Sequence, residues 1–231
     1  MATIELSEIK QYSDEQGNEI KSSSNHANCK ITFRGSNNKL TVADGAIINC
    51  VISFDCNNAI VEIGSHSVER IPFRASMRVG EDARITIGNN VTCTSTVFIS
   101  AVEGACVEIG EDSMIASGVV IRSDDAHPIF DVETGRRLNP ARDVKIGNHV
   151  WLGDRCAIMS GSSIGDGSII GIGSIVKKKI PNNSVAAGVP AKVIKKNVAW
   201  ERPHLSLRKP FYKNDASTVT KSDYWNLTED A

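Results

Sequence analysis

The sequence predicts an all-β protein, a three-sided solenoid of short parallel strands. One observation is a repeat: from Ile146 to Val176 an aliphatic residue stands at every sixth position. The other is the composition, because the 231 residues include 18 Gly but only six Phe, three Tyr and three Trp. A period of six is neither the 3.6 of a helix nor the two of a long strand. Three repeats of six would close one triangular coil, so that each aliphatic side chain stacks on its counterpart three repeats later.

The hexad repeat has three regular positions. The aliphatic residues predicted to point to the axis are Ile146, Leu152, Ile158, Ile164, Ile170 and Val176. Two places before them stand smaller residues that would fill the inward corners: Val150, Cys156, Ser162, Ser168 and Ser174. Glycine often follows the aliphatic residue, as at Gly147, where it is expected to relieve a bend with an awkward φ.

A coarser repeat carries the solenoid upstream. An apolar-x-apolar-small tetrad occurs five times, as LTVA (40–43), VEIG (61–64), ITIG (85–88), VEIG (107–110) and VKIG (144–147). Successive tetrads lie 21, 24, 22 and 37 residues apart, and the longest step contains an extra loop. We therefore predict a lead-in over 1–30 with a possible first strand at Cys29–Phe33, a β-helix over 31–180 interrupted by a loop at 122–143, and a C-terminal segment over 181–231.

Composition excludes several other classes of protein. A hydrophobic fraction of 41% and a formal net charge of −1 are those of a folded chain without the basic field that attracts nucleic acid. The charge is nevertheless divided, since the residues from Lys177 onward hold 11 Lys and Arg against 5 Asp and Glu. A lysine run is often only a solvated face, but at the end of a solenoid it also suits phosphate binding.

The N-terminus and the cysteines indicate the compartment. The first ten residues, MATIELSEIK, are polar and acidic where a signal peptide would be basic and then apolar, and no apolar run is long enough for a membrane span. The six cysteines are scattered without a C-x-x-C pair, so we expect reduced, mostly buried thiols and a cytoplasmic protein.

The loop carries the strongest candidate for chemistry. His127 lies in it, beside the carboxylates of Asp124, Asp125 and Asp131, which could orient an imidazole and stabilise its protonated form. A loop that interrupts a strict repeat is a common place for function, because the repeat itself does not need it. The alternative is an ordinary surface histidine in front of a proline.

Longer motifs in the second half of the chain resemble a known family. They are D-D-x-H-P-I-x-D (124–131), R-x-L-N-P (136–140), VKIGNHVWLG (144–153), GSSIGDGSIIGIGSIV (161–176) and AAGVPAKVIKK (186–196). This stretch, with 24 residues between His127 and Trp151, resembles the hexapeptide-repeat sugar and polysaccharide O-acetyltransferases. With the late Trp200 it looks closest to those of bacterial capsules, including sialic acid capsules. The upstream coils match only generically.

The resemblance implies a fold, a reaction and an assembly. The solenoid would be a left-handed parallel β-helix, and the protein a homotrimer with active sites between subunits. His127 would be the general base that lets a sugar hydroxyl attack acetyl-CoA directly, with Asp125 beside it. The indole N–H of Trp151 and main-chain N–H groups near Gly153 would stabilise the tetrahedral intermediate. For Trp151 a second role, at a subunit contact, stays open.

The resemblance also implies a coenzyme site. Pantetheine would lie along the coil edge, and the residues expected there or near the phosphates are Gly153, Gly171, Ile172, Lys177, Lys178, Pro190, Lys192 and Lys195. The chain departs from the commonest family pattern at Lys177-Lys178, where that pattern has Thr-Lys. No glycine-rich nucleotide motif opens a helix, so nucleotide-binding folds of that kind are not supported.

Two other functions compete with this prediction. A metal hydrolyase of the carbonic anhydrase kind needs three converging histidines. The chain has five, and none stands in the neighbouring repeat to join His127 and His149, so we expect no metal. The other alternative is a non-catalytic solenoid for binding or scaffolding. For an enzyme, a sugar or glycan hydroxyl is the favoured acceptor, and free sugar, nucleotide sugar and polymer all remain open.

Overall fold

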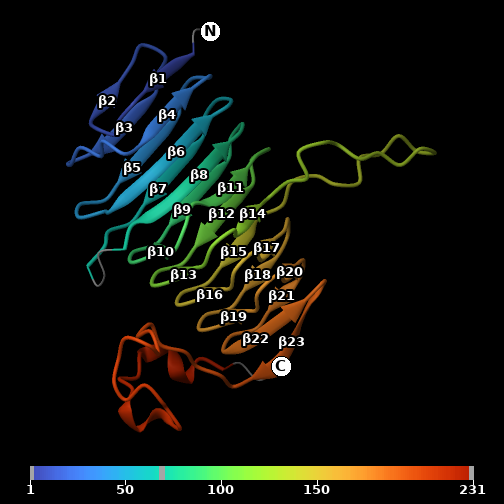
Figure 1. Cartoon of the computed structure of the whole chain (residues 1–231). Helices are drawn as coiled ribbons and strands as arrows, with labels where there is room; N and C mark the ends of the chain where they lie inside the picture. Colours follow the sequence, from blue (N-terminus) through green and yellow to red (C-terminus); the bar gives the residue numbers. More distant parts are fainter. Residues whose placement is uncertain (1–2, 68–70, 229–231) are drawn as a thin grey trace.

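Short strands wind into a three-sided solenoid in the computed structural model, which describes residues 3–67 and 71–228. Its axis runs from β1 at one end to β23 at the other (Figure 1). The coils contribute strands to two sheets at the N-terminal end and to three sheets from β10 (Thr92–Cys93) onward, so neighbours within a sheet come from successive coils. Apart from strands, the described residues form only two short 3-10 turns, η1 (Ala216–Thr218) and η2 (Asp223–Asn226). No helix among them is long and apolar enough to cross a membrane.

The three sheets contain eight, nine and six strands. The eight-stranded sheet has the order β1 (Ile4–Leu6), β4 (Lys30–Phe33), β6 (Ile48–Phe54), β8 (Phe73–Val79), β11 (Val97–Ala101), β14 (Val120–Arg122), β17 (Ala157–Ile158), β20 (Ile175–Val176). The nine-stranded sheet has the order β2 (Tyr12–Ser13), β3 (Glu19–Ser22), β5 (Lys39–Val42), β7 (Ile60–Ile63), β9 (Arg84–Ile87), β12 (Cys106–Ile109), β15 (Val144–Ile146), β18 (Ser163–Ile164), β21 (Lys179–Ile180). The six-stranded sheet has the order β10 (Thr92–Cys93), β13 (Met114–Ile115), β16 (Trp151–Leu152), β19 (Ile169–Ile170), β22 (Ser184–Gly188), β23 (Ala191–Lys196). Pairing is parallel except for β1–β4, β2–β3 and β22–β23.

The predicted stacking of the hexad aliphatics is confirmed. Ile146 lies opposite Ile164, Leu152 opposite Ile170 and Ile158 opposite Val176. All six hexad aliphatics and the five smaller residues before them are buried. Near the N-terminal end aromatic rings join the column, and those of Phe33 and Phe54 stack 5.0 Å apart. The core is therefore one continuous column of branched side chains.

The role expected for the hexad glycines was wrong. Gly88, Gly147, Gly153 and Gly165 are not among the residues with positive φ. Instead, a Cβ on Gly88 would lie 2.5 Å from the backbone nitrogen of Glu111, and one on Gly153 would lie 2.6 Å from the carbonyl oxygen of Ile170. These glycines are needed because the backbone of the next coil approaches them closely. The left-handed corners are occupied by other residues, such as Asn90, Asp112 and His149.

Sheet pairing extends past both predicted ends of the solenoid. Within the expected lead-in, β3 pairs in parallel with β5, although only Ile20 of its four residues is buried, which leaves no hexad signal in the sequence. At the other end, β22 and β23 continue the six-stranded sheet beyond residue 180. The predicted loop lies where expected, since β14 ends at Arg122 and β15 begins at Val144.

All six cysteines are free, and four of them are buried. Burial raises the pKa of the Cys93 and Cys156 thiols to about 12. Both side chains thus behave as small apolar core residues.

Candidate active site

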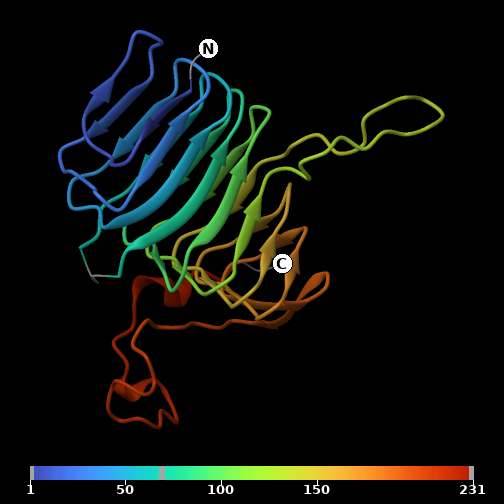
Figure 2. The ribbon, with the colours of Figure 1, turned by 45° about the horizontal axis from the view of Figure 1, so that its top comes forward.

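The loop at 123–143 leaves the solenoid between β14 and β15 and projects away from it (Figures 1 and 2). Its two ends meet, because the Arg142 N–H donates to the Ser123 carbonyl at 3.0 Å. Its outer part exposes the apolar side chains of Ile129, Phe130 and Leu138. The body of the solenoid therefore holds this loop mainly at its base.

Asp124 anchors the entrance of the loop. Its carboxylate is 5% exposed and accepts hydrogen bonds from the Ser100 hydroxyl (2.6 Å), the Arg122 guanidinium (3.0 Å) and the Ala126 N–H (2.7 Å). Burial by itself raises the pKa of this carboxyl, but the hydrogen bonds outweigh burial, so the pKa lies below its ordinary value. Asp124 is thus a buried, charged link between the loop and β11.

His127 follows directly on a tight turn. Ala126 has φ of 65°, and the His127 N–H donates to the Asp125 carbonyl at 2.8 Å. The His127 carbonyl accepts from the Asn139 side-chain amide at 2.9 Å, and the same amide group donates to the Asp125 carboxylate at 3.1 Å. The main chain of His127 is thus fixed by hydrogen bonds, while its imidazole ring is exposed to solvent.

None of the neighbouring carboxylates contacts the His127 ring in the described part of the chain. Asp124 bonds at the loop base, Asp125 bonds to Asn139, and Asp131 accepts from the backbone and the hydroxyl of Thr134. In this structure the three carboxylates are thus hydrogen-bonded to other groups of the loop and its base. Asn139 was missed as a site residue, although the sequence showed it within R-x-L-N-P.

A hollow of about 200 Å³ lies at the inner end of the loop. Asp125 and Asn139 line it together with Arg142, Ser160 and Lys177. Asp125 of the predicted catalytic set and Lys177 of the predicted coenzyme set thus line the same hollow within a single chain.

Trp151 lies on a different face from the loop. It belongs to β16 in the six-stranded sheet, between Met114 and Ile169, whereas the loop continues from β14 in the eight-stranded sheet. The Trp151 side chain is 38% exposed, and its ring centroid is 5.9 Å from that of Trp200. Within the described ranges no contact joins Trp151 to His127.

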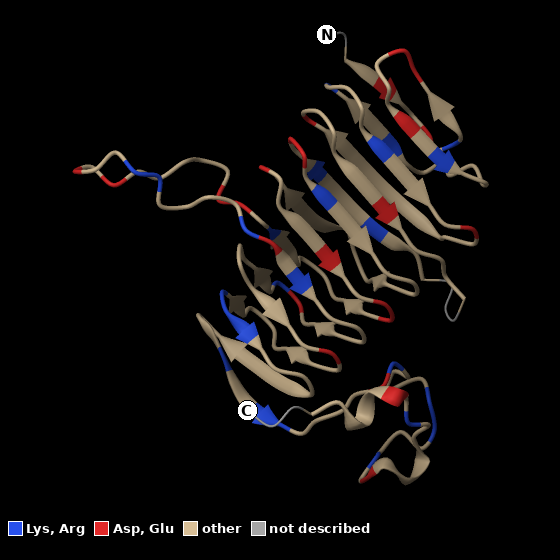
Figure 3. Cartoon of the chain, turned by 180° about the vertical axis from the view of Figure 1, so that it is seen from behind, with Lys and Arg blue, Asp and Glu red and all other residues tan. Residues whose placement is uncertain are grey.

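The predicted coenzyme residues lie along the last coils. Gly153, Gly171 and the exposed Ile172 follow β16 and β19, and Lys177 and Lys178 follow β20. Lys192 and Lys195 lie on β23, where Figure 3 shows basic residues at the end of the solenoid, and Pro190 lies in the β22–β23 turn. The Gly153 N–H itself donates to the Ile170 carbonyl at 2.8 Å.

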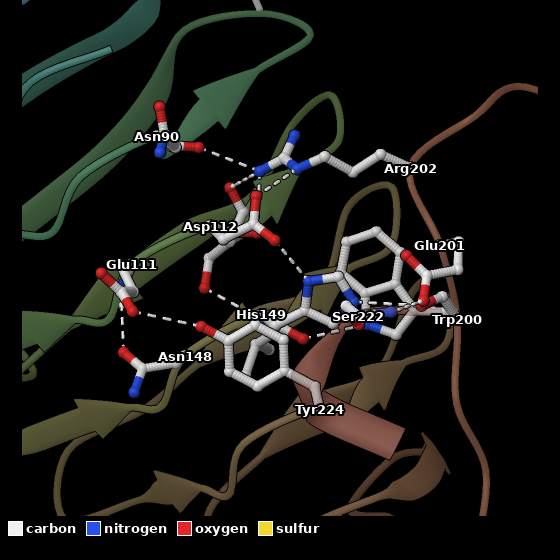
Figure 4. Close-up of polar contacts among 12 residues, drawn as sticks. Asn90, Glu111, Asp112, Asn148, His149, Trp200, Glu201, Arg202, Ser222 and Tyr224 are labelled. Atoms are coloured by element: carbon white, nitrogen blue, oxygen red, sulfur yellow. Dashed lines mark hydrogen bonds and ion pairs between the residues drawn. The ribbon is translucent and has the colours of Figure 1, made fainter. Parts of the chain in front are cut away.

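The C-terminal extension, residues 198–228, follows one corner of the solenoid. At this corner successive coils place Asn90, Asp112, His149, Gly167 and Asn183, all with positive φ. Asn183 donates to the Val198 carbonyl, His149 bonds the Trp200 carbonyl, and Arg202 reaches Asp112 and the Asn90 carbonyl (Figure 4). The extension therefore ascends this corner coil by coil.

His149 is the centre of this contact. Its ring is 2% exposed and stacks between Trp200 and Tyr224, with centroids 4.1 Å and 4.6 Å away. Nδ1 lies 2.6 Å from the Asp112 carboxylate and Nε2 lies 3.0 Å from the Trp200 carbonyl. Both ring nitrogens therefore lie against oxygen acceptors. Nothing in the sequence beyond the presence of His149 and Trp200 indicated this pairing.

Asp112 is held by the Arg202 guanidinium and the His149 ring. It accepts from Arg202 at 2.5 Å and from His149. Partial burial by itself raises the pKa of the Asp112 carboxyl. The hydrogen bond from His149 and the charge of Arg202 lower this pKa by more, so it lies below its ordinary value. Asp112, His149, Trp200 and Arg202 form what we call the corner cluster. This hydrogen-bonded network fastens the extension to the solenoid.

Comparison with known proteins identifies the family of this chain. A family model described as bacterial transferase hexapeptide (six repeats) matches residues 143–178. The polysialic acid O-acetyltransferase of Neisseria meningitidis is 34% identical over 179 residues, which cover 75% of this chain and 80% of that protein. The chain belongs to the hexapeptide-repeat O-acetyltransferases.

Other relatives of this family are similar over different shares. The polysialic acid O-acetyltransferase of Escherichia coli O1:K1 / APEC is 44% identical over 120 residues, but the chain spans only 39% of its length. The crystal structure of the polySia-specific acetyltransferase NeuO superposes with a TM-score of 0.69 at 35% identity, covering 79% of this chain and 85% of that one.

Membership of the hexapeptide-repeat O-acetyltransferases confirms two predictions. The fold class is the left-handed parallel β-helix expected from the resemblance. The chain is an enzyme of the acetyl-CoA-dependent acyltransferase class, which removes the alternative of a non-catalytic solenoid. Among the residues that the structure describes, no group of three or more His, Cys, Asp or Glu is placed to hold a metal ion.

Proposed function

We propose that this enzyme transfers the acetyl group of acetyl-CoA to a hydroxyl of a glycan, with His127 as the general base. The observation that carries the proposal is the exposed His127 imidazole on a main chain fixed from both sides, at the longest break in the repeat. Two of the relatives are named for acetylation of polysialic acid, which makes a capsule-type polymer of sialic acid the first acceptor to try.

The proposed reaction is a direct transfer. His127 takes the proton of the sugar hydroxyl while the oxygen attacks the thioester carbonyl, because the free alkoxide is scarcely populated at neutral pH. When the tetrahedral intermediate collapses, the C–S bond breaks and the imidazolium returns its proton to the coenzyme A thiolate. Trp151 is the candidate oxyanion donor, since its indole nitrogen donates to no described residue.

We also propose that the active site forms between copies of the chain in a homotrimer. The loop and Trp151 lie on different faces of one chain, so a second copy is needed to bring His127 to a Trp151. On the eight-stranded sheet an outward row is mostly apolar, and in register it contains Val51, Ser76, Phe98, Val120, Ala157 and Ile175. The corresponding row on the nine-stranded sheet is polar or charged, with Thr41, Glu62, Thr86, Glu108, Lys145, Ser163 and Lys179. Burial against another copy suits the first row and not the second.

Acetyl-CoA would lie along the last coils, beside Gly171 and Ile172, with its phosphates near Lys177, Lys178, Lys192 and Lys195. These lysines are exposed, and charge attraction to a phosphate suits such side chains. Pro190 stands in the turn between β22 and β23, at the edge of the same surface. We expect a cytoplasmic enzyme, and the six free cysteines fit this expectation because thiols stay reduced in the cytoplasm.

The test is release of free coenzyme A from acetyl-CoA, with hexoses, amino sugars, sialic acids and capsular polymers as acceptors. We expect acceptor-dependent release that falls by about 10²–10⁴-fold in His127→Ala, the usual contribution of a general base. His204→Ala is the matched control, because His204 is an exposed histidine in the extension whose ring, among residues 3–67 and 71–228, hydrogen-bonds only to Ser206. A His127→Ala enzyme with the wild-type rate would overturn the assignment.

A further inference from the structure

The main chain before His127 is held in a conformation that it would not adopt freely. Ala126 has φ of 65°, in the left-handed region that non-glycine residues rarely occupy. Its N–H donates to the buried Asp124 carboxylate at 2.7 Å, and the His127 N–H closes the turn on the Asp125 carbonyl. Asp124 in turn is fixed to Ser100 on β11 at 2.6 Å. A disfavoured conformation held by such contacts is a common feature of functional sites.

The main chain after His127 is held by one side chain, that of Asn139. Its amide oxygen accepts from the Ile129 N–H at 2.7 Å, and its amide nitrogen donates to the His127 carbonyl at 2.9 Å. The same nitrogen also donates to the Asp125 carboxylate at 3.1 Å. Asn139 thus joins the two arms of the loop across His127, using both its donor and its acceptor.

We propose that Asp124 and Asn139 are positioning residues that fix His127 for proton transfer, and that Asp125 serves Asn139 as a hydrogen-bond acceptor. This inference rests on the proposed role of His127 as the general base. Misplacement of a reacting group by about 1 Å can cost about 10²-fold in rate, so a clamp on the backbone of His127 has a direct effect on turnover. Asp125 acts through Asn139, because its carboxylate is bonded there.

The clamp is separable from the stability of the solenoid. The loop projects from the body of the molecule, and the buried column of the core includes neither Asp125 nor Asn139. A substitution at Asn139 should therefore leave the unfolding temperature unchanged. Asp124 is buried against β11, so its replacement would affect folding as well, and Asn139 is the better residue to test.

The experiment compares Asn139→Asp with wild type and with Asn25→Asp, because Asn25 is an exposed amide whose side chain, within the described part of the chain, hydrogen-bonds only to Glu8. Asn139→Asp loses both amide hydrogens and sets a second carboxylate against Asp125. We expect kcat to fall by about 10- to 100-fold with the KM for acetyl-CoA within about twofold and no change in Tm. Asp125→Ala removes the carboxylate that accepts from the Asn139 amide and should lower kcat in the same direction, so an unchanged kcat would overturn the role of Asp125.

A double-mutant cycle distinguishes positioning from general damage. In the His127→Ala enzyme, Asn139→Asp should cause no further loss, because the clamp acts only through His127. An equal loss in both backgrounds, or an unchanged kcat in Asn139→Asp, would overturn the clamp while leaving the general base in place. If His127→Ala itself were fully active, the proposed function would fail instead, whatever the result at Asn139.

Discussion

The chain leaves its solenoid twice, once in the loop at 123–143 and once in the C-terminal extension, and it secures the two departures differently. The extension is fastened to the corner cluster, where the contacts of His149 with Trp200 join residues 51 apart and those of Arg202 with Asp112 join residues 90 apart. The loop is fixed mainly by its own residues, such as Asn139 with His127, which are 12 apart. A few contacts, such as that of Asp124 with Ser100, tie its base to the coils.

This difference separates stability from function. Polar groups in the corner cluster are buried or half-buried and are paired, so the extension should unfold together with the coils it covers. The loop exposes His127 and several apolar side chains, which is a cost to an isolated chain and an advantage at a site that meets substrate or another subunit.

Excision of the loop should give the largest loss of acetyl transfer. Residues 125–141 can be replaced by two glycines, because Ser123 and Arg142 are already hydrogen-bonded across the base. Acetyl transfer should fall to background while Tm, followed by circular dichroism, stays close to that of wild type. A large loss of Tm would show instead that the loop stabilises the coils.

Removing a cation from the corner cluster should act in the opposite way. Arg202→Ala leaves the partly buried Asp112 carboxylate short of a partner, and we expect a loss of about 3 kcal/mol in the free energy of unfolding by urea titration. The loop offers the matched control, Arg137→Ala, because Arg137 pairs with Glu103 on the surface and should leave the midpoint unchanged. Equal midpoints for the two variants would contradict the structural role of the extension.

The smallest effect is expected in the pH dependence of the free energy of unfolding. The folded pKa of Asp112 is lowered, so its stabilising contribution is complete above the unfolded pKa of about 3.9 and is lost as the pH falls through the folded value. Wild type should thus exceed Asp112→Asn in stability by a constant amount from pH 7 to 5, and the difference should shrink below about pH 4. A difference that vanished between pH 7 and 5 would exclude the ionised Asp112 as its source.

The sequence predicts the repeated part of this molecule better than the parts that decorate it. The stacking of Ile146, Leu152 and Ile158 on the next coil follows from a period visible within a few residues. His149 shows no such signal, because it stands at an ordinary corner position and its partners Asp112 and Arg202 are far away in the chain. The resemblance pointed to His127 and Trp151, but only the structure shows that one chain holds them on different faces.

The central claim is that His127 of one copy works with Trp151 of another, and mixing two inactive variants tests it most directly. His127→Ala and Trp151→Ala are co-expressed with different tags, and assemblies carrying both tags are isolated and assayed for acetyl transfer. In a three-fold assembly that shares its sites, every assembly with both variants has one interface in three with both native residues, so activity should return to about a third of the wild-type value. Mixed assemblies no more active than either variant alone would contradict the claim.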